Sequence, residues 1–349
     1  MLFIRLILLP FTILYALCIL IRNLLYKGGI LTRMEFDFPV ICVGNLAAGG
    51  TGKTPHIEWI IEKFINEYKI SLLSRGYKRK TKGYVFADEN ATPDTIGDES
   101  FQVKRKFPEV TVAVCENRLL GIPHLIGDAP ESQFMLMDDG FQHLPVKAGL
   151  YILLTDYHNL FTSDWLIPSG LLREFRSGYK RAHIIVVTKC PTELSPARKA
   201  EIRKKIQPLS HQQLLFSSIQ YDKLIPVFEP WRIGADKQTQ VLCFSGIANA
   251  ALFEQYLATE FTLADSIRFK DHHHYMENDF QNLLSRFNQI ESKNKIMVCT
   301  EKDVFNLRDA GMGTLPVYAC RIGLAISDAA AFWDAVMSAA GRRRMVKPA

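Results

Sequence analysis

The sequence contains little cysteine, and its few cysteines follow no recognised pattern. There are seven in 349 residues, and no two form a C-x-x-C pair. An odd, scattered set excludes a disulfide framework and the spacing of common zinc sites. Because runs such as ICVGN and VLCFSG place cysteine among apolar residues, we expect reduced, mostly buried thiols in a protein that faces the cytoplasm.

The chain also lacks an apolar run of the length of an ordinary membrane span. The run Leu6–Ile21 is shorter than the roughly 20 residues that a span requires, and Pro10 lies within it. No small-x-small cleavage site of a signal peptide follows, but Arg22 and Lys27 do, and such residues suit acidic headgroups. We predict a membrane-associated helix in residues 1–32, either an uncleaved anchor or a helix embedded in one leaflet. A buried helix of the soluble core is the alternative.

A strong excess of one charge is absent as well. The formal net charge is +6, and basic residues cluster at Arg75–Lys82, Arg173–Arg181 and Arg342–Arg344. Such clusters suit an anionic partner, namely phosphate, nucleic acid or an acidic membrane, although each also fits a solvated face. With 48% hydrophobic and 22% charged residues, the composition is globular and the chain is long enough for two domains.

A glycine-rich segment, GNLAAGGTGKTP, follows the apolar run FPVICVGN. The strict phosphate-loop pattern G-x-x-x-x-G-K-[ST] requires glycine at position 47, where this chain has Ala47. A strand before the loop and a helix after it, with Pro55 in the first turn, would still direct backbone N–H groups at a phosphate. Lys53 would reach the β and γ phosphates and Thr54 would bind Mg²⁺. The residues predicted to hold the nucleotide are Gly49, Gly50, Thr51, Gly52, Lys53 and Thr54.

Short apolar runs alternate with helical segments after this loop. We predict an α/β fold: a P-loop NTPase-like parallel sheet with helices on both faces, plus a second, smaller α/β domain. The expected strands are 38–45, 70–74, 110–114, 134–139, 151–156 and 183–189. Short extended pieces over 216–240 indicate a linker, so the predicted divisions are the helix 1–32, a kinase core 33–215, a β linker 216–240 and a C-terminal domain 241–349.

Three further motifs carry acidic residues or histidines. The run FMLMDDGFQH ends a strand in Asp138 and Asp139, where a second Mg²⁺ contact is expected downstream of a phosphate loop. The segment IGDES contains Asp98, and FKDHHHYMEND contains three successive histidines, which cannot all face one metal ion. An aspartate paired with a histidine could instead take the proton from a hydroxyl group.

In this order the motifs GNLAAGGTGKTP, SRGY, GDE, DDGFQH, GLLRE, DHH and TEKD resemble the tetraacyldisaccharide 4'-kinase family of Gram-negative bacteria. The resemblance covers nearly the whole chain. It implies transfer of the γ-phosphoryl group of ATP, with Mg²⁺, to the 4'-hydroxyl of tetraacyldisaccharide 1-phosphate, which yields lipid IVA. It also implies a location at the cytoplasmic face of the inner membrane, by peripheral binding or a single N-terminal anchor.

The resemblance further implies roles for individual residues. Asp98 matches the catalytic base and His272 its partner, although His273 could carry that role. Thr54, Asp139 and Glu174 match Mg²⁺ positions, but Phe175 replaces the usual proline after Arg-Glu, so the placement of Glu174 is open. Other positions expected at the active site or the lipid substrate are Asp138, His143, Arg75, Arg118 and Arg173.

Three other classes of protein were weighed against the kinase. A membrane-bound ATPase switch of the partitioning type carries a lysine where this loop has Ala48. A GTP-binding regulator needs an N-K-x-D motif, which the sequence lacks. Basic clusters alone do not indicate a nucleic-acid protein, because no reading motif accompanies them. We therefore expect the lipid substrate and the membrane surface as partners, no nucleic acid, and a monomer.

Overall fold

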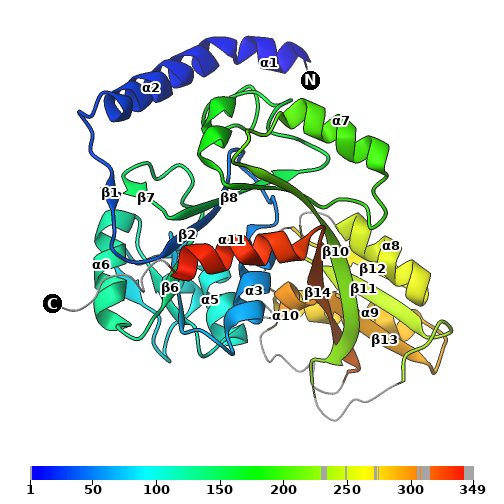
Figure 1. Ribbon diagram of the computed structural model, residues 1–349. Coiled ribbons are helices and arrows are strands. Elements are labelled where there is room, and N and C mark those ends of the chain that lie inside the picture. Colours follow the sequence, from blue (N-terminus) through cyan, green and yellow to red (C-terminus); the bar gives the residue numbers. More distant parts are fainter. Residues whose placement is uncertain are drawn as a thin grey trace. The chain divides into compact units, whose positions relative to one another are not determined.

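The structure, a computed structural model, describes residues 2–228, 234–247, 250–270, 273, 275–304, 307 and 315–341. The chain forms two compact units, the first made of Met1–Ile219 with Leu324–Ala349 and the second of Gln220–Gly323. Figure 1 shows both units. The domain ranges expected from the sequence stay predictions.

The first unit contains most of the strands and helices. Its strands are β1 (Met34–Glu35), β2 (Val40–Asn45), β3 (Ile70–Ser74), β4 (Val85–Phe86), β5 (Thr111–Val114), β6 (Phe134–Asp138), β7 (Val146–Lys147), β8 (Leu150–Asp156) and β9 (Ile184–Thr188). Its helices are α1 (Leu2–Ile7), α2 (Leu9–Lys27), α3 (Lys53–Phe64), α4 (Pro93–Ile96), α5 (Asp98–Lys106), α6 (Arg118–Asp128), the 3-10 helix η1 (Arg176–Arg181), α7 (Pro196–Ile206) and α11 (Ala329–Gly341).

A large sheet forms the centre of the first unit, in the order β10-β9-β8-β2-β6-β3-β5-β4, where β10 is Gln213–Pro226. Its neighbouring strands are parallel except that β4 runs antiparallel to β5. Both faces of the sheet are apolar, because its central strands are buried at every position and successive residues of a strand point to opposite sides. Cys42 packs in one core with α6 and α7, whereas Ile41 and Val43 pack in the other with α3, α5 and α11. The predicted α/β fold with a large, mostly parallel sheet is confirmed.

The strand order places the phosphate loop between strands that come later in the chain. The chain runs from β2 through α3 to β3, and β6 then inserts between these two strands while β8 pairs with the other edge of β2. In such parallel sheets, ligands bind at the carboxyl ends of strands where the winding direction changes. Asn45, Asp138 and Ser74 therefore end at the same edge of the sheet.

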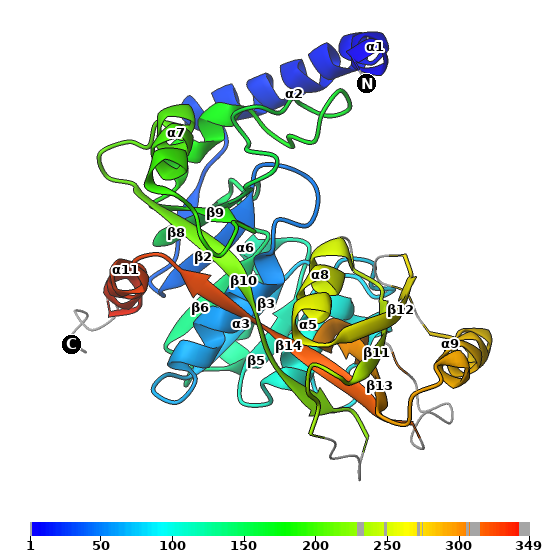
Figure 2. The ribbon, with the colours of Figure 1, turned by 90° about the vertical axis from the view of Figure 1, so that its right-hand side faces the viewer.

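The second unit is a smaller parallel sheet in the order β12-β11-β13-β14. Alternate residues again face two sides: Phe244 packs with α9, and Cys243 packs with α8. The elements are β11 (Gln240–Ser245), α8 (Ala250–Glu260), β12 (Thr262–Arg268), α9 (Glu277–Gln289), β13 (Lys295–Thr300), α10 (Glu301–Val304) and β14 (Val317–Ile326). Figure 2 shows these strands in a view turned by 90° from that of Figure 1.

One expectation about the connection was wrong. Instead of several short extended pieces, residues from 213 onward form the single strand β10 (Gln213–Pro226), which passes from the first unit into the second. It stays extended because it pairs with β9 at its start and has β14 as its other neighbour. Pro226, which has no N–H to donate, stands at its end, where a strand tolerates proline.

The N-terminal helix is longer than the apolar run suggested. Pro10 lies in the first turn of α2, where a missing N–H costs no hydrogen bond, so the helix continues for 19 residues to Lys27. With a mean hydropathy of 1.7, α2 is long and apolar enough to cross a membrane. Its large exposed apolar side chains are Phe11, Ile13, Leu14, Leu17, Leu20, Ile21 and Leu24.

A glycine contact fixes the start of α5. Gly97 has a φ of 83° and a ψ of 153°, a conformation that essentially requires glycine. A Cβ atom there would lie 2.7 Å from the carbonyl oxygen of Tyr77 and 3.0 Å from the carbonyl carbon of Gly76. The SRGY loop and the GDE turn therefore touch through their backbones, and this contact sets where Asp98 begins the helix.

We expect Gly97→Ala to destabilise the fold by about 2 kcal/mol, because the new methyl group is strained and also meets the SRGY backbone. Gly127→Ala in α6 is the matched control, since a Cβ there meets nothing within 4 Å. That variant should gain up to about 1 kcal/mol. Urea unfolding followed by circular dichroism measures both, and a Gly97→Ala protein as stable as wild type would contradict the argument.

Candidate active site

The phosphate loop has the geometry that a glycine-rich anion site requires. It runs between β2 and α3, and Gly49 and Gly52 adopt positive φ values of 113° and 85°. Lys53 is the first residue of α3, so the positive end of the helix dipole faces the loop. Ala47, the mismatch to the strict pattern, forms an antiparallel bridge with Leu172. This position is thus part of an extended segment, which does not require glycine.

The side chain of Asn45 holds the phosphate loop through hydrogen bonds. Its side-chain amide, fully buried, donates to Oγ1 of Thr51 at 2.7 Å and to the carbonyl oxygen of Gly49 at 3.4 Å. Asn45 was not among the residues predicted from the sequence, although it is the last residue of the strand in FPVICVGN. The signal that could have found it is its position, because a polar side chain at the end of a buried strand needs a partner.

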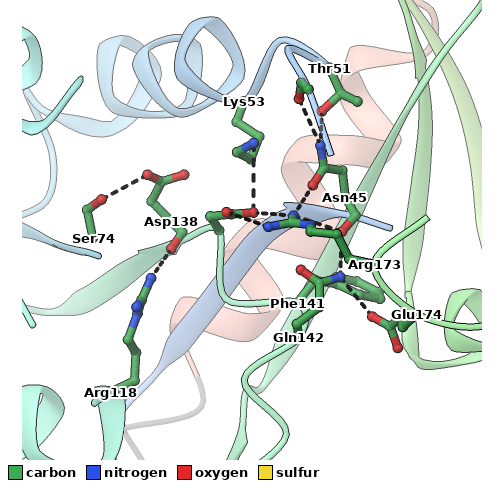
Figure 3. A network of polar contacts seen from close by, with 12 residues as sticks. Asn45, Thr51, Lys53, Ser74, Arg118, Asp138, Phe141, Gln142, Arg173 and Glu174 are labelled. Atoms are coloured by element: carbon green, nitrogen blue, oxygen red, sulfur yellow. Dashed lines mark hydrogen bonds and ion pairs between the residues drawn. The ribbon is translucent and has the colours of Figure 1, made fainter. Parts of the chain in front are cut away.

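Asp139 lies between two cationic side chains. Arg173 donates to both carboxylate oxygens, at 2.7 and 2.9 Å, and Nζ of Lys53 lies 3.7 Å from Oδ1. Arg173 also donates to Oδ1 of Asn45. Burial alone would raise the pKa of Asp139, but the Arg173 hydrogen bonds and the Lys53 charge outweigh it and lower the pKa to about 2. Figure 3 shows Lys53, Arg173 and Asn45 converging in this network.

Asp138, the preceding residue, points elsewhere because Asp139 has a left-handed backbone, with a φ of 47°. Its Oδ2 accepts a hydrogen bond from Ser74 Oγ at 3.0 Å, and its carbonyl oxygen accepts one from Arg118 at 2.9 Å. In the described part of the chain, its Oδ1 is buried and has no hydrogen-bond partner. One oxygen of a buried carboxylate is thus left for a ligand.

The electrostatic environments of the two aspartates are opposite. Burial raises the pKa of Asp138, the negative charges of Glu99 and Asp139 raise it further, and Lys53 lowers it only in part, so that the pKa reaches about 7. Among these charges, that of Glu99, the second residue of α5, is the largest that raises the pKa of Asp138.

Two other predicted residues are Arg118, which is buried, and His143, which is half-buried. Arg118 is 3% exposed and donates to the carbonyl oxygens of Cys115, Glu116 and Asp138, so it holds the ends of two strands together. For His143, burial and the charge of Arg118 lower the pKa to about 4, so its imidazole is neutral at pH 7.

Glu174 is engaged in a tight ion pair. Both its oxygens accept hydrogen bonds from Arg181 at 2.8 Å, and Oε1 also accepts one from Gln142 at 2.8 Å. The same Gln142 amide donates to the carbonyl oxygen of Asn45. Gln142 and Arg181 were not singled out in the sequence analysis, although one lies in DDGFQH and the other ends a basic cluster.

The remaining predicted residues lie at the start of α5, in the SRGY loop, in the second unit or outside the described residues. Asp98 is half-buried at the start of α5, and Arg75 is exposed in the SRGY loop. His272 lies outside the described residues, so its pairing with Asp98 stays a prediction. His273 lies in the second unit, where its Nε2 is 2.9 Å from Asp279 and its ring stacks on Phe269.

The TEKD motif has a structural role in the second unit. Asp303, 1% exposed, accepts hydrogen bonds from the N–H of Gly246, the hydroxyl of Tyr275, and both the N–H and hydroxyl of Thr300. This carboxylate therefore joins the turns after β11 and β13 to the segment that follows the three histidines.

A comparison with known proteins connects these motifs. The family model described as "Tetraacyldisaccharide-1-P 4'-kinase" matches residues 4–340 of the chain. The chain belongs to the tetraacyldisaccharide 4'-kinase family. The predicted enzyme class and its role in lipid A biosynthesis are thereby confirmed.

Relatives of the tetraacyldisaccharide 4'-kinase family match over most of their length. The Tetraacyldisaccharide 4'-kinase of Flavobacterium johnsoniae is 45% identical over 307 residues, which cover 88% of each chain. That of Bacteroides thetaiotaomicron is 43% identical over 310 residues, which cover 85% of this chain and 82% of the relative. The solved structure of "apo" form LpxK from Aquifex aeolicus in complex with ATP has a TM-score of 0.75 and 25% identity, and the match covers 96% of this chain and 99% of that one.

The residues at the strand ends fit a magnesium ion that a 4'-kinase would use with ATP. Among the described residues, no three His, Cys, Asp or Glu side chains gather around one point. Mg²⁺ does not require such a cage, because it is usually held by one or two carboxylates together with phosphate oxygens and water. Asp138, with its unbonded buried oxygen, Asp139 and Thr54 fit this requirement. To bind the ion, Asp139 would give up part of its contact with Arg173, and Glu174 would give up part of its contact with Arg181.

Because the folded-state pKa of Asp138 lies above the value of about 4 for an unfolded aspartate, the folded protein retains this proton over a range where the unfolded chain loses it. Its contribution to stability is present below about pH 4 and is lost as pH rises through about 7. Asp138→Asn removes this dependence, so in EDTA buffer the variant should gain stability relative to wild type between pH 5 and pH 8. Thermal unfolding at both pH values measures the gain, and parallel pH profiles would refute it.

Proposed function

We propose that this protein transfers the γ-phosphoryl group of ATP to the 4'-hydroxyl of tetraacyldisaccharide 1-phosphate, forming lipid IVA, and that it does so as a monomer at the cytoplasmic face of the inner membrane. The observation that carries the proposal is the convergence of Lys53, Arg173 and Asp139 beside a phosphate loop. Phosphoryl transfer asks a protein chiefly to position reactants and to neutralise charge, and this arrangement serves both.

The phosphate loop would bind the nucleotide. Backbone N–H groups around Gly49, Gly50 and Gly52 can approach phosphates closely, since no side chain stands between them and a ligand. Lys53, anchored at the start of α3, would neutralise the β and γ phosphates. Arg173 would stabilise the charge that develops on the transferred group, while its second contact on Asn45 keeps it aligned with the loop.

A magnesium ion held by Thr54, Asp138 and Asp139 would supply further neutralisation of phosphate charge. The contacts of the two aspartates indicate that they would hold the ion in different ways. Asp139 also orients Lys53 and Arg173, whereas Asp138 has an oxygen without a hydrogen-bond partner.

Asp98 is the proposed general base. A carboxylate at the first position of a helix is stabilised in its charged form, which is the form that accepts a proton from the 4'-hydroxyl. His272 is its proposed partner, in accordance with the family resemblance. The backbone contact between Gly97 and the SRGY loop would fix the distance from this base to the carboxyl edge of the sheet.

The acceptor explains why the enzyme needs the membrane. Each methylene group removed from the bilayer costs about 0.8 kcal/mol, so a lipid with four acyl chains stays in the bilayer and the enzyme must reach it there. The exposed apolar residues of α2 supply a surface for that contact. Of the basic residues expected to meet anionic lipid groups, Arg173 is bound to Asp139 and Arg79 to Glu116, whereas Arg75 is exposed.

A direct transfer assay tests the activity. Purified protein, γ-labelled ATP, Mg²⁺ and tetraacyldisaccharide 1-phosphate in detergent should give labelled lipid. Asp98→Asn should reduce the rate by about 10²- to 10⁴-fold while ATP still binds, because it removes only the base. Lys53→Ala should impair both binding and transfer.

Two outcomes would count against the proposal. ATP hydrolysis without labelled lipid would favour the membrane-bound ATPase switch, and dimerisation on ATP addition would then be measured. Full activity of Asp98→Asn would remove Asp98 from the chemistry and leave the general base unassigned.

We expect Arg75→Glu to lower activity on vesicles that contain anionic lipid, with a smaller effect in neutral detergent, because the reversed charge repels the headgroups or the 1-phosphate. Lys63→Glu is the matched control: it makes the same charge change at an exposed position in the last turn of α3, far from the loop end of that helix. Equal activity of both variants on such vesicles would exclude this role for Arg75.

A further inference from the structure

The N-terminal helix α2 is bound to the rest of the first unit along one face. Thr12, Tyr15 and Ile19 lie on one face of α2, since they are spaced three and four residues apart. Thr12 donates from Oγ1 to Oγ of Ser169 at 2.7 Å, and Ser169 donates to the carbonyl oxygen of Arg5 at 3.0 Å. Figures 1 and 2 show α2 beside the segment between β8 and α7. The helix is therefore held on the protein by specific hydrogen bonds.

Tyr15 makes the bond nearest to the active site. Its hydroxyl donates to the carbonyl oxygen of Arg173 at 2.8 Å. The side chain of the same Arg173 holds Asp139 with two hydrogen bonds and also contacts Asn45. A residue of the N-terminal helix thus fixes the backbone of the arginine on which the polar network depends.

The other side of this segment is bonded to the beginning of the phosphate loop. The N–H of Ala48 donates to Leu171 at 2.7 Å, the N–H of Arg173 donates to Leu46 at 2.8 Å, and Ala47 pairs with Leu172. Residues 171–173 therefore lie between α2 and the phosphate loop and are bonded to both. The sequence does not indicate this arrangement, because α2, the phosphate loop and residues 171–173 are far apart in the chain.

We infer that Tyr15 is a positioning residue for ATP, acting through residues 171–173 on Arg173 and the phosphate loop. The inference rests on the proposed function and extends it: α2 takes part in building the nucleotide site as well as in reaching the membrane. The two tasks use different faces of the helix. Tyr15 and the buried Thr12 face the protein, while Leu14 and Leu17 are 62% and 51% exposed.

A hydrogen bond to the Arg173 backbone can affect the nucleotide site because the Arg173 guanidinium must be oriented toward both of its partners, Asp139 and Asn45. A guanidinium that donates to both oxygens of a carboxylate loses these bonds when its backbone shifts or rotates. Sites of this kind work only when supporting hydrogen bonds fix the residues that touch the ligand. The Tyr15 hydroxyl is such a support, and its loss should loosen the loop without removing any group that contacts ATP.

The test is the affinity of the full-length protein for Mg²⁺-ATP in detergent, measured by calorimetry without lipid substrate. Tyr15→Phe keeps the ring and its packing and removes one hydroxyl. We expect its Kd for ATP to rise about threefold to tenfold, the effect of one lost hydrogen bond. Binding to vesicles should be unchanged, because the exposed apolar face is intact.

Two control variants separate positioning from anchoring. Tyr26→Phe makes the same change on the same helix, at a residue whose ring lies 5.5 Å from the Arg33 guanidinium. It should leave the ATP affinity unchanged. Leu17→Asp should weaken vesicle binding and leave ATP affinity unchanged, which is the reverse of the Tyr15→Phe result.

Each outcome decides the inference. Equal ATP affinities of wild type and Tyr15→Phe would overturn it, and so would an equal loss in Tyr26→Phe. Loss of affinity in Tyr15→Phe alone supports it. Failure of the wild-type protein to bind ATP would instead overturn the proposed function, so the two failures are distinguishable.

Discussion

The carboxylate of Asp139 is the interaction on which the rest of the site depends. It lies at the carboxyl end of β6, next to β2, and its two oxygens hold Arg173 while Lys53 lies beside one of them. Two cations this close would repel each other without an anion between them. By binding both, Asp139 keeps the positive charge that a triphosphate requires concentrated over the phosphate loop. The low pKa of its carboxyl group keeps it charged throughout the physiological pH range.

The neighbouring Asp138 shows how one turn can give two carboxylates different tasks. The left-handed backbone at Asp139 directs the two side chains apart, so that only Asp139 meets the cations closely. Asp138 lies in a buried site, where its side chain accepts a hydrogen bond from Ser74 and its carbonyl oxygen accepts one from Arg118. A buried carboxylate with a raised pKa and an unbonded oxygen is costly for the apo fold. Carboxylates with a perturbed pKa are common at functional sites, and a bound cation would stabilise the charged form of this one.

The same polar network extends outward to the N-terminal helix. Arg173 is reached from one side by Asn45 and the loop and from the other by Tyr15. In the proposed function, the helix that would contact the membrane is thus hydrogen-bonded to the residue that would orient the phosphate site. The segment Ser169–Arg173 is hydrogen-bonded both to α2 and to the beginning of the phosphate loop.

The sequence by itself determined the family, the α/β class, the phosphate loop and most strands of the first unit, because these depend on local signals. Strands β3 and β6 follow from their apolar runs, and Gly49, Gly52 and Lys53 follow from the spacing of the loop. The tertiary structure alone decided which motifs meet. Asn45, Gln142, Arg181 and Tyr15 acquire their roles only from partners distant in the chain, as the bond from Tyr15 to Arg173 shows. The same holds for Glu174, which the family resemblance assigned to a metal and which the fold pairs with Arg181. A hydrogen bond between distant segments leaves no periodic or spacing signal in the sequence, so only the packing of the chain could reveal it.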